Sequence, residues 1–536
     1  MRTRSRHWIW NTMAWVCALA VGPLAAGCDS NETTVDCEVA IIGGGPGGLH
    51  TAFRLGSTQG KNVCLIEKES ELGGRIHDVP FDEKDPGSPR VGVGGRRVME
   101  TQEVLFSLAT ELGITMEKPA LVADLIGARG KYAFAKDDLR SQYQGLLTQQ
   151  DLSVDYETWL YDVLRKGPGR AGIGSAVDLR SYVRANAGLS GYDFLRDMSR
   201  FRADFEYPLD ARGYMDYLDE EWDVCCQASY PIGGMSTFIQ GMEKKAVESG
   251  VRIFKSQAVT HIERSGKGFR YRVRSQADSA AGSTAKNLVV NANRLVVAVS
   301  PYWLKQIEGD VANDIKGKSE FQQITSVRVV TITQWWPEAW WQQIKDPSKT
   351  SDNNVWRAWT TDLCLNFMEI PQEPYAAAAK VTRTVYDDDI RCVQFWEELA
   401  KQGMPKLEAE LQAQLNKLFN NNGATMPATV SIPKPLKTYV KVWPDAWHWL
   451  GASATLTNAD LANWAVQPLS GEEVGLVGEA YYVNRSGWSD GAYKSSLRLL
   501  NEKYGLKLPG VATRTQGLQA GAEPSPARRL RSQGGH

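Results

Sequence analysis

The chain has 536 residues, enough for two or three domains and a sizeable core. Hydrophobic residues make up 43% of the sequence and charged residues 23%, a balance typical of a globular protein. The formal net charge of −1 supplies no global attraction for nucleic acid or for an acidic membrane surface, so we expect neither as a binding partner.

The first residues have the pattern of a secretory signal. Three arginines precede an apolar stretch from Trp8 to Ala26, which ends in the small residues of "PLAAGCDS". The string "LAAGC" resembles a bacterial lipobox, in which Cys28 is lipidated and becomes the mature N-terminus; a plain signal peptide with an incidental cysteine is the alternative. We therefore exclude residues 1–28 from the fold. We expect an exported, lipid-anchored bacterial lipoprotein that faces the periplasm or the cell exterior.

No later segment reaches the ~18 apolar residues needed to span a bilayer, so the lipid would be the only membrane attachment. Two of the eight cysteines, Cys17 and Cys28, belong to the signal. Cys37 and Cys64 lie in expected buried strands, where an inert thiol is the default interpretation. Export permits disulfides, but the sequence assigns none. No spacing typical of metal ligands occurs, and we expect no metal site.

The first element of the mature chain is a nucleotide-binding unit. An apolar strand over Val39–Ile42 leads into Gly43, Gly45 and Gly48, which fill the pattern G-x-G-x-x-G before a helix. These glycines permit a tight turn, a close approach of the backbone to a pyrophosphate, and packing of the helix on the strand. A second strand ends at Glu67, whose carboxylate would accept hydrogen bonds from a ribose. Strand, glycines, helix, strand and acid in this order predict a dinucleotide site.

The following motif, "ELGGRI", indicates which dinucleotide binds. It resembles the second fingerprint of FAD enzymes of the amine oxidase superfamily, and the resemblance implies that Gly74 and Arg75 lie along the FAD pyrophosphate. A surface turn with a solvated arginine is the alternative. We expect FAD as the cofactor.

Three more motifs extend the resemblance: "YPIGGMSTFIQGM", "GVRIFKSQAVTHIE" and "GLVGEAYYVNRSGWSDGAYKSSLRLL". With them, the chain from Gly43 to about Leu500 resembles the flavin-containing amine oxidases. This implies an α/β fold with a discontinuous Rossmann-like FAD-binding domain, a mixed-sheet substrate domain and a helical insertion. It also implies that the backbone near Val259 touches the adenine half of FAD.

The resemblance and the local patterns together divide the chain into segments. Amphipathic stretches with apolar residues at three- and four-residue spacing indicate the helical insertion, and the small, polar end of the chain indicates a disordered tail. The expected segments are FAD-binding parts at 36–120, 229–301 and 446–508, a helical insertion at 121–228, a substrate domain at 302–445 and the tail at 509–536.

The closing motif would complete the cofactor site. The resemblance places Glu479 at the pyrophosphate and ribityl chain, and Gly487, Trp488 and Ala492 at the flavin ring. Trp488 would form an aromatic wall beside the flavin and the substrate, and the Gly487 backbone would receive the substrate amino group. Relatives that bind FAD covalently carry a cysteine just before this aromatic residue. The segment "YYVNRSGW" has none, so we expect non-covalent FAD.

Two adjacent arginines suggest the substrate. "GVGGRRVME" resembles the segment of L-amino acid oxidases in which G-x-x-R precedes an apolar residue, so that Gly94 is the glycine and Arg97 binds the substrate carboxylate. A buried carboxylate needs a counter-charge, and the planar fork of arginine suits it. Gly95 and Arg96 would then lie close to the flavin, with Arg96 replacing an apolar residue of relatives.

The alternative makes both arginines solvated charges that precede a helix. Thr101 would cap this helix. Its buried face would consist of apolar side chains at helical spacing, namely Val104, Leu105, Leu108 and Leu112.

Other positions depart from the family pattern or have an open role. Relatives carry a lysine near the flavin on a substrate-domain strand, whereas "TSVRVVTITQWWPEAWW" offers only Arg328 as a nearby cation. His448 is more simply a packed or hydrogen-bonded histidine than a catalytic one. The aromatic segments "WRAWTTDLCLNF" and "VWPDAW" would either line the substrate pocket or pack in the core.

These motifs predict an FAD-dependent L-amino acid oxidase that forms 2-oxo acids, ammonia and hydrogen peroxide from an amino acid and oxygen, with a preference for large apolar or aromatic side chains. A monoamine or polyamine oxidase and an amino acid monooxygenase are alternatives on the same fold. A non-catalytic FAD-binding partner protein is an alternative of another class. A homodimer is compatible with the sequence, which does not fix the oligomeric state.

Overall fold

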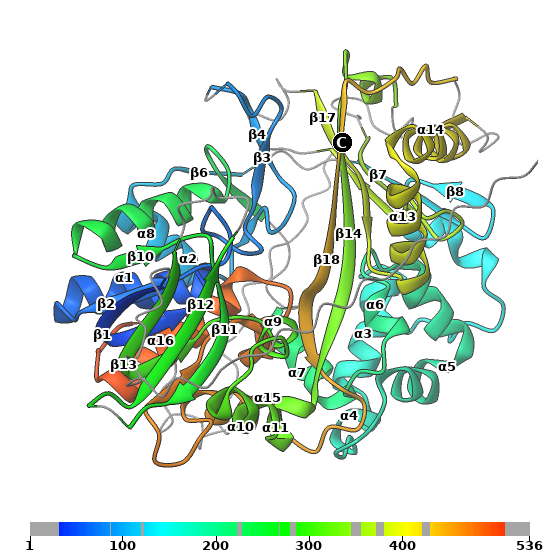
Figure 1. Ribbon diagram of the computed structural model, residues 1–536. Coiled ribbons are helices and arrows are strands. Elements are labelled where there is room, and N and C mark those ends of the chain that lie inside the picture. Colours follow the sequence, from blue (N-terminus) through cyan, green and yellow to red (C-terminus); the bar gives the residue numbers. More distant parts are fainter. Residues whose placement is uncertain are drawn as a thin grey trace, which may run out of the picture.

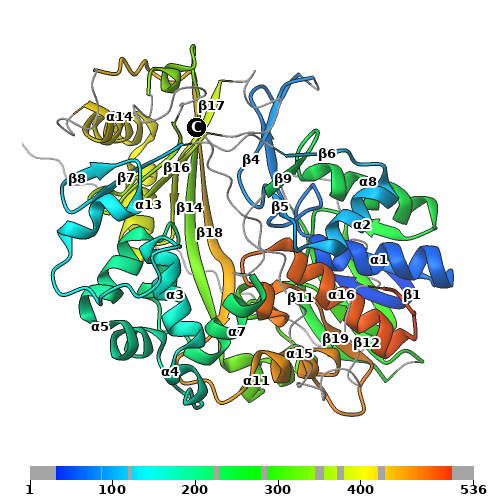
Figure 2. The same ribbon diagram turned by 180° about the vertical axis from the view of Figure 1, so that it is seen from behind.

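The computed structural model describes residues 32–85, 87–118, 123–221, 228–266, 268–278, 286–344, 355–370, 380–420 and 429–509. The predicted signal at 1–28 and almost all of the predicted tail lie outside these ranges. Two large sheets organise the chain, and each has seven strands. Figure 1 shows the first sheet beside helices α1 and α16, and the long strands β14 and β18 of the second sheet standing next to it; Figure 2 gives the reverse view.

The first sheet is the predicted nucleotide-binding sheet. Its parallel part follows the order β10, β2, β1, β13, and the antiparallel strands β12 and β11 extend it. β19 runs parallel to the last residues of β13. The strands are β1 (Glu32–Ile42), β2 (Val63–Ile66), β10 (Arg252–Phe254), β11 (Gln257–Arg264), β12 (Tyr271–Ala277), β13 (Asn287–Val297) and β19 (Val474–Leu476).

Helices that lie far apart in sequence cover one face of this sheet. α1 (Pro46–Gln59) packs against both α8 (Ser236–Glu248) and α16 (Ser489–Tyr504). Their apolar sides share one core with Val39, Ile41 and other strand residues. The glycines after β1 let α1 approach the sheet this closely, because a Cβ on Gly48 would lie 2.0 Å from the Gly43 carbonyl oxygen.

The second sheet is the substrate-domain sheet. Its order is β18, β14, β17, β16, β15, β7, β8. Its strands are β18 (Lys437–Leu450), β14 (Ile324–Trp335), β17 (Val381–Asp387), β16 (Phe367–Glu369), β15 (Val355–Thr360), β7 (Ala123–Ala128) and β8 (Lys131–Ala133). β18 runs to Leu450, so the substrate sheet extends five residues beyond the expected boundary at 445.

Helices cover both faces of the second sheet, and successive strand residues alternate between them. Val330 and Ile332 pack with α13 (Ile390–Gln402) and α14 (Met404–Asn420), whereas Val327 and Val329 pack with the helical insertion. The insertion contains α3 (Tyr156–Lys166), α4 (Pro168–Ala171), α5 (Leu179–Met198), α6 (Ala203–Glu206) and α7 (Ala211–Glu221).

The first residues of the predicted helical insertion are not helical. β7 and β8 lie within 121–228, yet they pair with β15 and with each other at the edge of the substrate sheet. Their short apolar runs show no helical period, and their pairing with a strand more than 200 residues later is not visible in a local pattern.

The helix after the two arginines forms as α2 (Glu103–Leu112). Val104, Leu105 and Leu108 are buried as predicted, and Leu112 is half-buried. Thr101 does not cap it: the helix begins after Gln102, and no side chain caps its N-terminus.

Small elements complete the described fold. They are the hairpin of β3 (Asp78–Pro80) and β4 (Arg90–Gly92), the strands β5 (Val98–Met99), β9 (Ala228–Pro231) and β6 (Met116–Glu117), and the helices α9 (Pro301–Leu304), α10 (Asp310–Lys316), α11 (Ser319–Gln322) and α15 (Asn458–Val466). Within the described ranges, we find no helix with the length and apolarity needed to traverse a bilayer.

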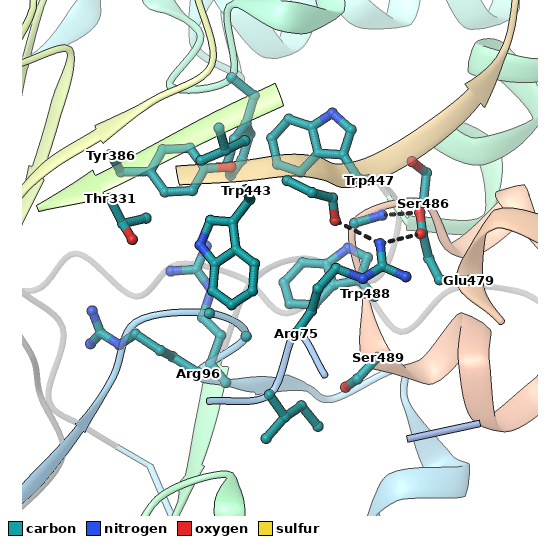
Figure 3. A pocket seen from close by; sticks show the side chains of 18 of the residues that line it. Arg75, Arg96, Thr331, Tyr386, Trp443, Trp447, Glu479, Ser486, Trp488 and Ser489 are labelled. Atoms are coloured by element: carbon teal, nitrogen blue, oxygen red, sulfur yellow. Dashed lines mark hydrogen bonds and ion pairs between the residues drawn. The ribbon is translucent and has the colours of Figure 1, made fainter. Parts of the chain in front are cut away.

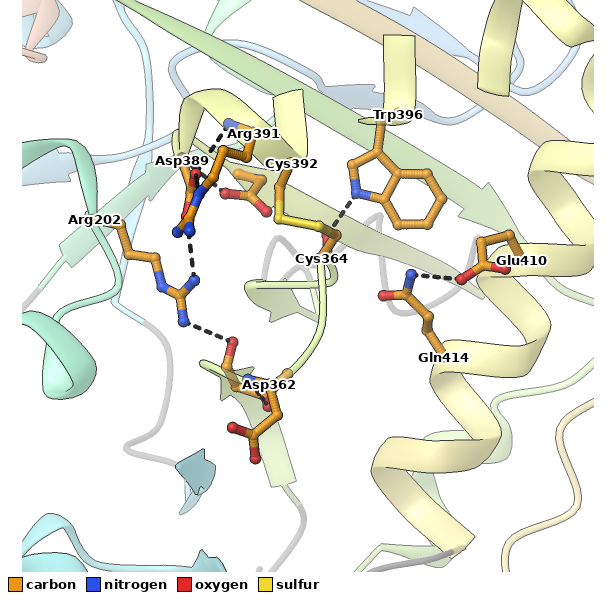
Figure 4. The surroundings of a disulfide bond; sticks show 11 residues. Arg202, Asp362, Cys364, Asp389, Arg391, Cys392, Trp396, Glu410 and Gln414 are labelled. Atoms are coloured by element: carbon orange, nitrogen blue, oxygen red, sulfur yellow. Dashed lines mark hydrogen bonds and ion pairs between the residues drawn. A yellow bond between two sulfur atoms is a disulfide. The ribbon is translucent and has the colours of Figure 1, made fainter. Parts of the chain in front are cut away.

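Two disulfides connect parts of the chain that are distant in sequence. Cys37 and Cys64 join the neighbouring strands β1 and β2, so the expectation of two inert thiols was wrong. Their Cα atoms lie 6.0 Å apart, a normal span for a disulfide, and only the strand pairing brings them this close. Cys364 and Cys392 join the segment after β15 to the start of α13 (Figure 4), where the Trp396 indole donates a hydrogen bond to the Cys364 carbonyl.

Candidate active site

One cavity lies where the nucleotide-binding sheet, the substrate sheet and the helical insertion meet. It contains roughly 1280 Å³ of space, solvent at its mouth included. It reaches from Pro46, at the start of α1, to aromatic side chains of β17 and β18. Its lining includes eight of the predicted site residues: Arg75, Gly95, Arg96, Arg97, Glu479, Gly487, Trp488 and Ala492.

The nucleotide end of the site lies at the carboxyl edge of the first sheet. The Gly43 N–H donates to the Ile66 carbonyl at 2.8 Å, which holds the turns after β1 and β2 together. Glu67 accepts the N–H of Gly44 at 2.7 Å, and burial raises the pKa of its carboxyl despite this hydrogen bond. A Cβ on Gly45 would meet no atom within 4 Å. The open space beside a helix N-terminus fits a pyrophosphate.

Val259 lies close to this end and outside the cavity lining. Its strand begins where the Gln257 N–H donates to the Glu67 carbonyl at 2.8 Å. The Glu67 carbonyl thus binds the backbone two residues before Val259, although β2 and β11 are not adjacent in the sheet. That Glu67 and Val259 hold the adenosine half of FAD remains a prediction. Gly43, Gly45, Gly48 and Glu67 also lie outside the cavity lining.

The second fingerprint crosses from the nucleotide end into the cavity. Gly74 has φ +54°, and a Cβ there would come within 3.3 Å of the Gly45 Cα. The Arg75 guanidinium donates to the Ala446 carbonyl at 2.8 Å and to Glu479 Oε2 at 2.9 Å. Figure 3 shows the Arg75 side chain reaching across the pocket to Glu479. The Arg75 guanidinium is thus hydrogen-bonded in the cavity wall. The alternative, a surface turn with a solvated arginine, is therefore wrong.

Glu479 organises the wall next to it. Its Oε1 accepts the N–H of Gly487 at 2.9 Å and that of His448 at 3.1 Å, while its Oε2 lies 2.8 Å from His448 Nδ1. Burial alone would raise the pKa of this carboxyl, but His448 and Arg75 lower it to about 2. Glu479 is therefore a buried anion between the Arg75 guanidinium and the His448 ring.

His448 supports Glu479, a role that the sequence did not specify beyond hydrogen bonding. Its ring is completely buried, and Glu479 raises its pKa against the opposing effect of burial. Its Nε2 lies 3.8 Å from Asp445 Oδ2, too far for a hydrogen bond. The only sequence signal was a histidine on a strand near the closing motif.

The predicted flavin-facing residues line the cavity together. The N–H of Gly487 is bound to Glu479, which leaves its carbonyl to receive an amine, and the residue has φ +74°. Trp488 is half-buried, with its indole N–H 3.4 Å from the Tyr217 hydroxyl. Figure 3 shows the indole rings of Trp443, Trp447 and Trp488 gathered in one part of the cavity.

The "VWPDAW" segment therefore lines the cavity through Trp443 and Trp447. The segment "WRAWTTDLCLNF" does not: its Trp359 and Phe367 lie in the core between the substrate sheet and the helical insertion. The side chain of Trp356 lies outside the described residues.

Both arginines of the glycine-rich loop line the cavity, but in different environments. The Arg96 side chain is 3% exposed and donates to Glu369 Oε2 at 2.9 Å. The Arg97 side chain is 20% exposed, lies 3.3 Å from Glu369 Oε1, and has its guanidinium 5.8 Å from the Trp488 ring centre. Neither is the solvated charge of the alternative interpretation, and Arg97 is the one that remains accessible.

Glu369 and Arg383 complete this cluster and were not identified from the sequence. Arg383 lies 3.6 Å from Glu369 and donates to the Gly94 carbonyl at 3.0 Å. Burial would raise the pKa of Glu369, but the surrounding arginines, Arg96 first, lower it to about 2. Glu369 stands alone among apolar residues in "NFMEI", a weak sequence signal for a buried charge.

Three arginines of the cluster contact one carboxylate. Arg96, Arg97 and Arg383 all approach Glu369 within the described part of the chain. Nearby, Arg357 is neutralised by a two-pronged contact with Asp124, at 2.6 and 2.8 Å.

Arg200 adds a further positive charge beside the cluster. Its guanidinium is held among the rings of Phe201, Trp359 and Phe367, and Nη1 is buried without a hydrogen-bond partner in the described chain. Burial and the charges of Arg357 and Arg97 lower its pKa to about 10.

Arg328 does not replace the lysine of relatives. It pairs with Glu397 of α13 at 2.8 Å, on the face of the substrate sheet away from the cavity. The residues of β14 that line the cavity are Val329 and Thr331, and neither is cationic. The alternation of side chains along a strand explains this, because positions 328 and 329 face opposite ways.

The helical insertion supplies one wall that the sequence did not indicate. Phe201, Asp204 and Tyr217 line the cavity from this side. The Tyr214 hydroxyl donates to Asp204 Oδ2 at 2.9 Å, and burial raises the pKa of Asp204 to about 7. No local motif marks these residues, because only packing of the insertion onto the sheet brings them to the cavity.

Comparison with known families agrees with this geometry. The family model described as flavin containing amine oxidoreductase matches residues 46–498. The chain belongs to the flavin-containing amine oxidoreductase family. FAD is accordingly its cofactor, and the glycine cradle, Glu67 and the Arg75–Glu479 pair are the candidate residues that hold it.

Relatives of this amine oxidoreductase with curated descriptions align over short segments. FAD-dependent oxidoreductase dpchF of Colletotrichum higginsianum is 29% identical over 28% of this chain and 30% of its own length. Aplysianin-A of Aplysia kurodai is 27% identical over 26% of this chain and 24% of its own length. The chain thus spans less than a third of each relative.

Solved structures with the same fold align over most of the amine oxidoreductase chain. Putrescine oxidase bound to putrescine gives a TM-score of 0.60 at 15% identity, covering 88% of this chain and all of that chain. A double mutant of putrescine oxidase gives 0.61 with the same coverage. These matches establish the predicted fold, in which the FAD-binding domain, the mixed-sheet substrate domain and the helical insertion surround one cavity.

Proposed function

We propose that this flavin amine oxidoreductase oxidises L-amino acids to 2-oxo acids, ammonia and hydrogen peroxide. One observation carries the proposal: Arg97 lines the cavity with a side chain that is 20% exposed, and it shares its contact with Glu369 with Arg96 and Arg383. A substrate carboxylate inside the cavity needs a cation, and the accessible guanidinium of Arg97 offers it a planar, two-pronged partner. A simple amine is a cation in water, and the arginines of this cluster would repel it.

The reaction follows from the positions of the groups. The substrate carboxylate binds Arg97, the accessible member of the cluster, and Trp488 packs beside it. The Gly487 carbonyl oxygen accepts a hydrogen bond from the substrate amino group. Bound FAD would accept the hydride from the α-carbon and later transfer the electrons to oxygen. The imino acid then hydrolyses in water. The buried aromatic walls exclude water from the reacting carbon, which strengthens every charge interaction at the site.

Arg96 acts on Arg97 through their shared carboxylate. Arg96 donates to Glu369 Oε2 at 2.9 Å and Arg383 lies 3.6 Å from the same oxygen, whereas Arg97 makes a longer contact of 3.3 Å to Oε1. The fork of Arg97 therefore remains available for a bidentate contact with the substrate.

We further propose that the FAD is bound non-covalently and that the protein acts after export. The two disulfides are consistent with an oxidising compartment, and the lipobox-like segment would anchor the chain there. Denaturation should release the yellow cofactor from the chain. Colour that remains attached to the protein would contradict non-covalent binding.

Anaerobic mixing tests the proposed reaction. The purified holoenzyme is mixed with a panel of L-amino acids and a panel of amines, and loss of flavin absorbance is followed. Bleaching by amino acids supports the proposal. Bleaching by amines alone would instead identify an amine oxidase, and no bleaching by either panel would favour a non-catalytic FAD-binding protein.

A further inference from the structure

The cavity has charges of opposite sign on different walls. The arginine cluster lies in the loop before β5 and on β16 and β17, whereas Asp204 lies on α6 of the helical insertion. Between them the lining is aromatic and includes Phe201, Tyr386 and Trp449. A ligand that fills the cavity therefore meets guanidinium groups at one wall, with Arg97 the accessible one, and a carboxyl group at another.

Asp204 has no cationic partner in the described part of the chain. It is 9% exposed, and among the described residues its side chain accepts a hydrogen bond from the neutral Tyr214 hydroxyl. The nearest cation in sequence, Arg202, is directed to Asp389, with 3.6 Å between their charged groups. Burial, Asp387 and Asp204 together raise the pKa of the nearby Asp388, so a second buried acid lies close to Asp204.

Such a carboxyl is costly to ionise unless a cation reaches it from the cavity. A side-chain ammonium or guanidinium in contact with Asp204 would keep it ionised and pair it. The surrounding rings would add favourable cation–π contacts and would pack against the alkyl part of the ligand.

We propose that the substrate is an L-amino acid with a cationic side chain, and that Asp204 selects it by binding that cation. This inference rests on the proposed function, because it assumes that the α-carboxylate binds at Arg97. It replaces the preference for apolar or aromatic side chains expected from the aromatic walls. Those walls now serve the aliphatic stem of the substrate, and Asp204 determines specificity.

Three ligands test the proposed specificity: L-lysine, and two compounds that each lack one of its charged groups. L-lysine carries both groups, L-norleucine lacks the side-chain ammonium, and cadaverine lacks the carboxylate. We expect kcat/KM of the holoenzyme for L-lysine to exceed that for L-norleucine by at least ~10-fold, as for a site that pairs a buried charge. Equal values for the two amino acids would overturn the inference and leave the proposed function intact. Oxidation of cadaverine alone would overturn the proposed function, and this inference with it.

The variant Asp204→Asn isolates the contribution of the charge. It should reduce the preference for L-lysine over L-norleucine by ~10-fold or more, through L-lysine, while L-norleucine oxidation stays within about two-fold. Equal losses for both substrates would show that Asp204 has only a structural role. Asp210→Asn is the matched control, because Asp210 is also a buried acid of the helical insertion but does not line the cavity. It should leave the preference unchanged. If Asp204→Asn does not fold, the wild-type comparison of the two amino acids still decides the question.

Discussion

Arg97 differs from its neighbour in accessibility rather than in type. Both arginines bind Glu369, but the Arg97 side chain is 20% exposed and that of Arg96 only 3%. The sequence indicated Arg97 through the glycine before it and the apolar residue after it. It could not indicate that the Arg96 guanidinium pairs with the carboxylate of Glu369, which lies 273 residues further along the chain.

Replacing Arg97 by alanine tests its role. Arg97→Ala should weaken binding of amino acid substrates by ~2–4 kcal/mol, because the substrate carboxylate loses its partner inside the cavity. The measurement is the substrate dissociation constant from anaerobic flavin titration. Arg328→Ala is the control, since Arg328 pairs with Glu397 outside the cavity. If both variants bind the substrate as the wild type does, Arg97 is not the carboxylate-binding residue.

Asp204 should also make stability depend on pH. Its folded-state pKa of about 7 lies above the 3.8 expected in the unfolded chain. A raised pKa contributes stability that is fully present below pH ~4 and is lost as pH rises through about 7. The loss is on the order of 4 kcal/mol over that range. Denaturant unfolding of the substrate-free protein should therefore show a steeper decline between pH 4 and 7 than Asp204→Asn does. Parallel curves would contradict the raised pKa.

Glu479 and Glu369 have the opposite dependence. Both have a pKa of about 2 in the folded state, below the ordinary value of 4.5. Their contribution to stability is present above pH ~4.5 and is lost as pH falls toward 2. The carboxyl of Asp204, which has no cationic partner among the described residues, thus changes the stability between about pH 4 and 7. Those of Glu479 and Glu369, which contact arginines, change it below pH ~4.5.

At the scale of elements, the turn from β1 into α1 has two different steric requirements. A Cβ on Gly48 would overlap the Gly43 carbonyl oxygen, whereas a Cβ on Gly45 would point into open space. Gly48 is thus required by the protein itself, and Gly45 by what binds next to it. The glycine motif alone did not separate these two requirements.

Alanine at each glycine distinguishes them. Gly48→Ala should destabilise the protein even without FAD, by several kcal/mol, because backbone rather than a flexible side chain must move. Gly45→Ala should leave the unfolding free energy of the FAD-free protein within ~1 kcal/mol and weaken FAD binding. FAD release and thermal unfolding of both forms measure the two effects. Equal destabilisation of the FAD-free protein by both variants would argue against an open cradle at Gly45.

At the scale of the whole molecule, the disulfides tie separate parts of the chain together. Cys364 and Cys392 close a loop with a sequence separation of 28 residues. Chain-entropy arguments assign such a loop about 3–4 kcal/mol of stabilisation. The double variant Cys364→Ser and Cys392→Ser should lower the unfolding free energy by about that amount in non-reducing buffer. In reducing buffer, the wild type should approach the variant. No difference in either buffer would show that the bond is absent or energetically neutral.

Sequence patterns predicted local features well and distant contacts poorly. The glycine turn, Glu67, Arg75 and the closing motif were identified because each lies within a short segment of fixed spacing. Glu369, Arg383 and Asp204 were not, because each reaches the cavity only when two sheets and a helical insertion pack together. The same limit explains why β7 lies in a segment with a predicted helical fold and why the sequence does not pair Cys37 with Cys64.

The nucleotide-binding sheet takes its strands from both ends of the described chain. β1 begins at Glu32, whereas β19 and α16 extend from Val474 to Tyr504 and pack against β13 and α1. During synthesis, this domain is therefore incomplete until almost the last described residue has left the ribosome. An emerging chain holds an unfinished sheet with an unpaired side for most of its translation. Such an incomplete sheet exposes apolar surface and unpaired strand edges, so we expect the growing chain to be prone to aggregation until its final helix is in place.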